Sequence, residues 1–268
     1  MKKLVYTLTI ILLLLVFCVS AYFVGSYILE SREQAQQNEA LAELKNSIKE
    51  TKPEEPESTE ETTPEGTFGA AELRDENGML IEYGEIYAQN PDLVGWIRID
   101  GTKLDNPVLQ TPDRRDYYLN HDFYGQPSAW GAIYAREECD INTPSDNITL
   151  YGHNMRDGSM FAVANEYVYK ETWENNPLIF FDTLYEYHVY KIFAVFKTSA
   201  ILGQGFTYHN MIDATDKEEF DAFIAKCKEL SFYDTGLTPQ YGDKIICLST
   251  CEYTLDEGRL VIAAYRIS

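Results

Sequence analysis

The spacing of apolar residues divides the chain into an N-terminal apolar run, a polar middle segment and a long region of short apolar runs. Nearly every position from 4 to 29 is apolar, a run long enough to span the roughly 30 Å hydrocarbon core of a bilayer. A cleaved signal peptide also starts with basic residues such as Lys2 and Lys3, but its apolar core is shorter. The pattern therefore favours an uncleaved membrane anchor over residues 1–29. Because only Arg32 lies close behind the run, we expect a cytoplasmic N-terminus and an extracellular body.

Residues 30–78 contain too few apolar side chains to form a core of their own. Leu41, Leu44 and Ile48 recur at helical spacing, which predicts a short stalk helix with a thin apolar stripe. Pro, Glu, Thr and Ser dominate residues 51–66, a composition typical of a disordered tether. We therefore expect an anchor at 1–29, an acidic stalk and tether at 30–78, and a folded domain at 79–268.

The folded domain is expected to begin with a helix at 79–87, which stops before Asn90 because Pro91 follows. Beyond it the apolar period changes from 3.6 to two, which predicts short strands separated by Gly, Asn, Asp and Pro turns. These strands are expected at residues 94–99, 107–110, 130–134, 147–151 and 187–198. The pattern is typical of a mainly β domain, either a closed barrel or a sandwich.

Residues 215–230 interrupt the strands with a helical pattern. Thr215 and Glu218 are expected to form a capping box at its start. Its apolar stripe is interpreted as core packing. The stripe consists of Phe220, Phe223, Ile224, Cys227 and Leu230.

The strongest chemical signal is a thiol at a strand end. Residues 245–252 form an apolar run that ends in small polar residues and Cys251, a turn follows, and Arg259 starts the returning run. Across such a hairpin Arg259 can lie beside the thiol, which supplies a nucleophile and a permanent cation for an oxyanion. Arg266 lies seven residues further along, an odd number that places it on the opposite strand face. Cys247 shares the face of Cys251 but lies about 13 Å away, so we expect it to be a packed residue.

A nucleophilic thiol also needs a base, and four histidines are available. His153 follows the predicted strand 147–151 at a junction with a loop, where catalytic groups often collect. His188 lies inside an aromatic run, His209 lies in a predicted loop, and His121 adjoins Asp122. The residues alone favour His153 without excluding the other three.

Three ordered motifs resemble those of the sortases, the cysteine transpeptidases of Gram-positive bacteria. They are LYGHNM at 150–155, LSTC at 248–251, and Arg259 on the returning strand. YLNHDF at 118–123 and the helix before the cysteine strand are similar to class B sortases in particular. The resemblance covers residues 79–268, although Cys247 stands where the family usually has Thr.

The resemblance implies an eight-stranded sortase-type β-barrel with N-terminal helices and a helix inserted before the cysteine strand. It implies that Cys251 attacks the Thr carbonyl of a C-terminal sorting signal, while His153 transfers protons and Arg259 binds the oxyanion. The partners would be surface proteins that carry this signal, and an amine of a peptidoglycan precursor or of a pilin. Neighbouring residues would shape the peptide groove, although packing or local hydrogen bonding explains them equally well. They are Leu119, Asn120, Ser249 and Glu252.

Composition narrows the remaining alternatives. The formal net charge of −21 argues against nucleic acid as a partner. Five cysteines do not suggest a disulfide framework, and no metal or other cofactor is expected. A zinc site built from Cys247, Cys251 and a histidine stays a weaker alternative, because no second Cys/His cluster has metal-ligand spacing. Two other functions stay open: a Cys-His peptidase that uses water as acceptor, and a catalytically silent surface-binding domain on a tether.

Overall fold

The computed structural model describes residues 2–50, 73–201 and 203–268. They belong to two compact units, one ending at Ala40 and the other beginning at Leu41. The first unit consists of the larger part of helix α1 (Lys2–Glu50). Within the described residues α1 is the one helix long and apolar enough to cross a membrane, which is consistent with a single-pass membrane protein.

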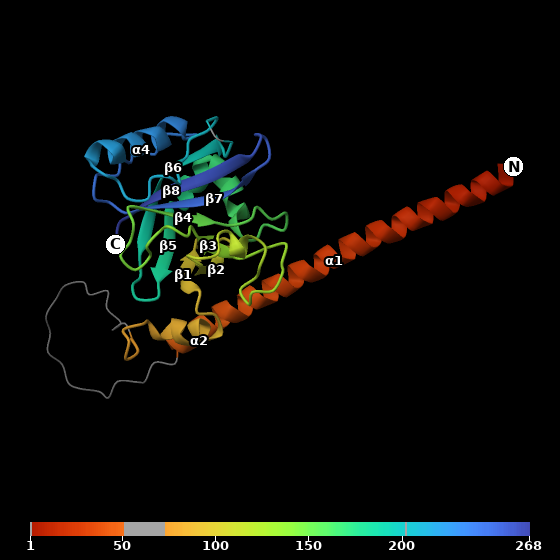
Figure 1. The fold of residues 1–268 in the computed structure, drawn as a ribbon, viewed down its shortest axis with the longest axis horizontal. Coiled ribbons are helices and arrows are strands. Elements are labelled where there is room, and N and C mark those ends of the chain that lie inside the picture. The colour runs from red at the N-terminus through yellow and green to blue at the C-terminus, as the bar shows by residue number, and fades with distance from the viewer. Residues whose placement is uncertain (1, 51–72, 202) are drawn as a thin grey trace. The chain divides into compact units, whose positions relative to one another are not determined.

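Eight strands of the second unit close into a barrel, as the resemblance implies (Figure 1). They are β1 (Leu93–Arg98), β2 (Asp105–Leu109), β3 (Ile133–Ala135), β4 (Asn147–Tyr151), β5 (Leu178–Thr183), β6 (Val189–Ser199), β7 (Ile245–Glu252) and β8 (Gly258–Arg266). Their order around the barrel is β1-β2-β3-β4-β7-β8-β6-β5. The β2–β3 and β4–β7 pairs are parallel, so the carboxyl ends of β4 and β7 lie at the same edge.

Helical segments connect the strands and cover parts of the barrel. They are α2 (Ile81–Gln89), η1 (Tyr117–Leu119), η2 (Phe161–Val168), α3 (Lys170–Asn175) and α4 (Lys217–Leu230). Figure 1 shows α4 on the outside of the barrel beside β6. The N-terminal helices and the helix before the cysteine strand are thereby confirmed.

The predicted strands at 94–99, 107–110 and 187–198 agree with β1, β2 and β6 to within two residues at each end, and larger differences occur at two places. The expected strand at 130–134 begins only at Ile133, because Trp130 and Gly131 belong to a turn in which Gly131 has a φ of 58°. Strand β5 is missing from the predictions, since its short apolar run shows no clear period of two in the sequence. By contrast, the expected strand at 147–151 coincides with β4.

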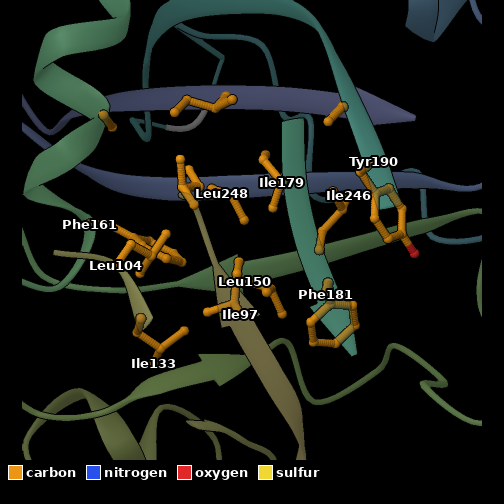
Figure 2. Packing of buried hydrophobic residues seen from close by; sticks show 14 of the residues in the cluster. Ile97, Leu104, Ile133, Leu150, Phe161, Ile179, Phe181, Tyr190, Ile246 and Leu248 are labelled. Atoms are coloured by element: carbon orange, nitrogen blue, oxygen red, sulfur yellow. The ribbon is translucent and has the colours of Figure 1, made fainter. Parts of the chain in front are cut away.

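The barrel interior is filled by aliphatic and aromatic side chains from strands that are distant in sequence. Figure 2 shows Ile97 of β1, Leu150 of β4, Ile179 of β5, and Ile246 and Leu248 of β7 in one cluster. All of these side chains are fully buried, and each such burial contributes up to about 1.5–3 kcal/mol. This packing fixes β4 and β7 relative to each other.

The start of α4 differs from the predicted capping box. The N-cap is Asp216, whose side chain accepts a hydrogen bond from the main-chain N–H of Glu219 at 2.9 Å. The predicted Thr215–Glu218 pair is wrong because the helix begins one residue later. Thr215 instead donates to the Glu219 carboxylate from its main-chain nitrogen and its hydroxyl.

The apolar stripe of α4 packs against the outer face of the barrel, as predicted. Phe220, Phe223, Ile224 and Cys227 are buried there in one cluster with Cys247. Cys247 is completely buried, which raises the pKa of its thiol. It is a packed residue, as the spacing along the strand indicates.

The last residues of α1 belong to the barrel unit. Leu41 is 1% exposed, and Lys45 forms an ion pair with Asp105 at 3.3 Å while its Nζ lies 4.2 Å from the centroid of the Trp96 ring. The predicted stalk helix is present, and the compact unit takes in residues well before 79. The tether expected at 51–66 lies outside the described residues, and the domain boundaries at 29/30 and 78/79 stay predictions.

Candidate active site

The β7–β8 hairpin brings the candidate thiol and cation together. Cys251 and Arg259 are direct partners in the antiparallel β7–β8 register. Most of β7 is buried, but Cys251 at its end is half-buried, so its thiol lies at the rim of the barrel. The Arg259 guanidinium is held by the turn through Nη1, which donates to the carbonyl oxygens of Gly258 at 2.9 Å and Glu257 at 3.3 Å. Its Nη2 also forms an ion pair with the Glu257 carboxylate at 3.7 Å, so the turn holds the guanidinium at the rim.

The rival cation lies at the other end of the hairpin. Arg266 pairs with Tyr190 of β6 and shares a pocket with His188 and Lys244. Since β7 begins at Ile245 beside that end, the length of the strand separates Arg266 from Cys251. Arg259 is therefore the cation that the fold places next to the thiol.

His153 comes to the same rim from β4. Tyr151 pairs with Ser249 in the parallel β4–β7 register, and the Gly152 N–H donates to the Ser249 carbonyl at 3.2 Å. A Cβ at position 152 would lie 2.8 Å from the Phe161 ring, so this close approach requires glycine. The β4–β7 pairing thus ends at Tyr151 and Ser249, and His153 and Cys251 each lie two residues beyond that last pair.

The ring of His153 is oriented by a main-chain carbonyl. Its Nε2 lies 2.7 Å from the Leu119 oxygen at the end of η1. A carbonyl only accepts, so Nε2 carries a proton, and in the neutral form of the ring the lone pair is on Nδ1. The arrangement supplies the third group that commonly orients a base beside a nucleophile.

The structure separates His121 and His188 from this arrangement. His121 stacks on Tyr117 with ring centroids 4.1 Å apart and contacts the Tyr117 carbonyl through Nδ1. His188 is buried, and burial together with Arg266 lowers its pKa. Both have the packed, locally satisfied positions that the sequence allows for them.

A cavity of about 320 Å³ lies beside the thiol. Its walls include Cys251, His153 and Arg259, together with residues of η1, β3, β4, β7 and the loop after β6. The other side chains are mainly aromatic or polar: Arg115, Asp116, Leu119, Tyr134, Tyr151, Ser199, Phe206, Thr207, Tyr208, His209, Ser249 and Thr250. The predicted contacts Leu119 and Ser249 belong to this wall.

Several wall residues were not predicted from the sequence. Tyr208 is 2% exposed and its hydroxyl lies 2.5 Å from Ser249 Oγ, while burial raises the Tyr208 pKa. His209 is half-buried, and burial followed by the charges of Arg136 and Arg115 lowers its pKa. The loop that carries both returns to the rim only in the folded chain, so no local pattern identifies Tyr208, and the sequence leaves His209 as one of four candidate bases.

The two remaining predicted contacts point elsewhere. The Glu252 carboxylate pairs with Lys197 at 2.7 Å and accepts from the main-chain nitrogens of Thr254 at 3.0 Å and Leu255 at 3.1 Å. Burial opposes ionisation of Glu252, but these hydrogen bonds outweigh it and hold its pKa below the usual range. Asn120 is exposed, and its carbonyl accepts from the Ser128 N–H at 3.0 Å. Neither side chain lines the cavity, so their contact with a peptide stays a prediction.

Metal chemistry has no visible site in the described part of the chain. No group of three or more His, Cys, Asp or Glu side chains is arranged there to hold a metal ion. The donor set at the rim is one thiol, one imidazole and one guanidinium, which suits nucleophilic catalysis.

Comparison with known proteins agrees with this geometry. The Sortase domain family matches residues 97–267. Sortase B of Listeria monocytogenes is 32% identical over 183 residues, which cover 68% of this chain and 72% of the relative. Sortase B of Staphylococcus aureus is 32% identical over 179 residues, covering 65% and 70% respectively. The structure of a Staphylococcus aureus sortase B–substrate complex has the same fold, with a TM-score of 0.73, 24% identity, and coverage of 90% of this chain and 99% of that one.

Proposed function

This chain belongs to the sortase family of cysteine transpeptidases, and on that premise we propose that it joins surface proteins to an extracellular amine. The donor would be a protein with a C-terminal sorting signal, cleaved after Thr. The acceptor would be an amine of a peptidoglycan precursor or of a pilin. One observation supports this function. Cys251 pairs with Arg259 across the β7–β8 hairpin, and β4 ends beside them, just before His153.

In the first half-reaction Nδ1 of His153 takes the thiol proton of Cys251, and the Cys251 sulfur attacks the Thr carbonyl carbon. The carbonyl oxygen becomes an oxyanion, which the Arg259 guanidinium would stabilise beside the turn. The C–N bond then breaks, and the protonated Nδ1 of His153 gives its proton to the leaving amine. The product is a thioester between Cys251 and the surface protein.

In the second half-reaction the acceptor amine attacks the thioester carbonyl. His153 takes the proton of the incoming amine at Nδ1, while its Nε2 hydrogen bond to Leu119 holds the ring in place. The C–S bond breaks and the Cys251 thiolate leaves. The same groups therefore serve both half-reactions with opposite directions of proton transfer.

The N-terminal part of the chain would keep the enzyme at the cell surface. Helix α1 supplies the candidate span, and Lys2 and Lys3 favour a cytoplasmic N-terminus with the barrel outside. This topology would place Cys251 in the compartment that contains the sorting signal and the cell-wall amine.

The test is product analysis with a library of sorting-signal peptides and defined amines. The proposal predicts a thioester on Cys251 and a peptide–amine product whose amount rises with the amine concentration. Hydrolysis at the same rate with and without amine would favour a Cys-His peptidase. Absence of any covalent adduct across the library would favour a silent binding domain.

A further inference from the structure

Asn154 follows His153 and contacts the main chain of Cys251 directly. Its Nδ2 donates to the Cys251 carbonyl oxygen at 2.9 Å. Asn154 therefore joins the loop that carries the candidate base to the residue that carries the candidate nucleophile.

The contact continues the β4–β7 ladder after β4 has ended. The last main-chain bond of that ladder runs from the Gly152 N–H to the Ser249 carbonyl at 3.2 Å. In a regular parallel ladder the next N–H to reach β7 would come from residue 154 and meet the carbonyl of residue 251. The Asn154 side chain supplies this donor in place of its own main chain. His153 is thus flanked on both sides by bonds to β7.

A second amide determines which end of Asn154 faces β7. Asn165 of η2 donates from Nδ2 to Asn154 Oδ1 at 2.7 Å, and Asn154 Nδ2 donates back to Asn165 Oδ1 at 3.2 Å. Asn165 Nδ2 also donates to the Ala162 carbonyl at 3.0 Å, which anchors the pair to η2. Because Asn154 Oδ1 is occupied by a donor, its N–H₂ group is the end presented to the Cys251 carbonyl.

The loop around His153 is braced from the same side. The Phe161 N–H donates to the His153 carbonyl at 2.9 Å, and the main chains of Asn154 and Met160 form an isolated antiparallel β-bridge. The main chain of His153 is therefore held between β7 and the start of η2, and Leu119 holds its ring.

From these contacts we infer that Asn154 is a positioning residue, which fixes His153 relative to Cys251 through the Cys251 main-chain carbonyl. This inference rests on the proposed cysteine chemistry. Asn154 does not touch the scissile bond in this role. Its loss should therefore slow the chemical steps more than it weakens peptide binding, because small misplacements of a catalytic group cost rate.

The decisive variant is Asn154→Asp in the full-length chain in detergent. It preserves side-chain size but sets a carboxylate oxygen against the Cys251 carbonyl. We expect kcat for thioester formation to fall on the order of ten- to a hundred-fold, with KM changed less than about twofold. Asn154→Ala removes the hydrogen-bond donor but places no negative charge beside the Cys251 carbonyl. Its kcat should therefore fall no further than that of Asn154→Asp. A packing role predicts the opposite order, since alanine removes more volume.

Asn165→Asp tests the same link from a residue that contacts neither His153 nor Cys251 in the described contacts. It removes the donor to Asn154 Oδ1 and should also lower kcat. The double variant with Asn154→Ala should be no slower than Asn154→Ala alone, because both changes act through one contact. Asn142→Asp is the matched control: it makes the same charge change in the exposed loop before β4, at the opposite end of that strand from His153.

Alkylation of Cys251 by iodoacetamide, mapped by peptide mass spectrometry, needs no peptide substrate. It separates failure of this inference from failure of the proposed function. We expect alkylation to slow in Asn154→Asp, Asn154→Ala and Asn165→Asp but not in Asn142→Asp. The inference is overturned if folded Asn154→Asp and Asn165→Asp are alkylated at the wild-type rate and have the wild-type kcat. Additive losses of kcat in the double variant would also overturn it.

Discussion

The Leu119 carbonyl oxygen lies 2.7 Å from Nε2 of His153, so the main chain of η1 orients the candidate base. The η1 segment is itself well held. The Tyr118 carbonyl accepts from the Ala132 N–H at 2.9 Å, and the Tyr118 hydroxyl donates to Asp92 at 2.8 Å. Correct placement of His153 therefore depends on a turn far from it in sequence.

Gly131→Ala should disturb this placement. Gly131 has a φ of 58°, and a Cβ there would lie 2.6 Å from the Leu119 oxygen. Either the oxygen or the turn must shift, so we expect slower thioester formation as well as lower stability. Gly101→Ala is the control, since Gly101 has a φ of 72° but open space around its Cβ position. If both variants lose the same melting temperature but only Gly131→Ala forms the thioester more slowly, the role of Leu119 is supported. Normal acylation by folded Gly131→Ala would contradict it.

Arg259→Lys should slow acylation severely. The ammonium keeps the charge but cannot reproduce the planar fork that the turn carbonyls hold beside Cys251. Loss of one oxyanion donor typically costs about a hundred- to a thousand-fold in rate. Arg266→Lys, at the other end of β8, should be mild. The readout is the rate of thioester formation next to a melting curve, and a larger defect in folded Arg266→Lys would identify the wrong cation.

Glu252 should make the stability of the domain depend on acid pH. Its pKa is lowered in the folded state by Lys197 and Thr254 despite burial, so the stabilisation is fully present above the unfolded value of about 4.3. It is lost as the pH falls through the lower folded pKa. We expect Glu252→Gln to be less stable than wild type at pH 7, and this difference to shrink towards pH 3. Urea unfolding at both pH values measures it, and a constant difference would exclude the ionic role.

The anchor and tether should be dispensable for chemistry in solution. Leu41 is buried in the barrel unit, so a chain starting at residue 41 should be more stable than one starting at residue 73. Burial of one such side chain contributes up to about 1.5–3 kcal/mol. Both forms should cleave a soluble peptide. Inactivity of a folded chain that starts at residue 41 would show that the anchor segment does more than localise the enzyme.

Much of the fold follows from local patterns in the sequence. Period-two runs such as 147–151 predict strands because one face of each strand meets the core, and α4 has a clear apolar stripe. The short run of β5 lacks such alternation, and the α4 cap shifted by one residue because Asp216 and Thr215 are both capable caps. Burial of Leu41 depends on a surface that only the closed barrel provides.

Some residues of the candidate site are also predictable from local sequence, whereas others depend on the tertiary structure. Cys251 and Arg259 lie on consecutive strands, so hairpin geometry predicts their pairing, and His153 follows from its place at a strand end. Tyr208 and His209 reach the cavity through a loop whose course no local pattern specifies. Glu252 follows the nucleophile in sequence, yet its carboxylate points to Lys197, a partner that lies on β6.

Intact-protein mass spectrometry determines whether the Cys251 thiol is the nucleophile. The full-length chain and its Cys251→Ala and Cys247→Ala variants are incubated with a cognate sorting peptide without added amine, and folding is checked by melting curves. We expect a thioacyl adduct in wild type and Cys247→Ala, because Cys247 is completely buried, and none in Cys251→Ala. An adduct on folded Cys251→Ala, or loss of the adduct in folded Cys247→Ala, would show that Cys251 is not the sole nucleophile.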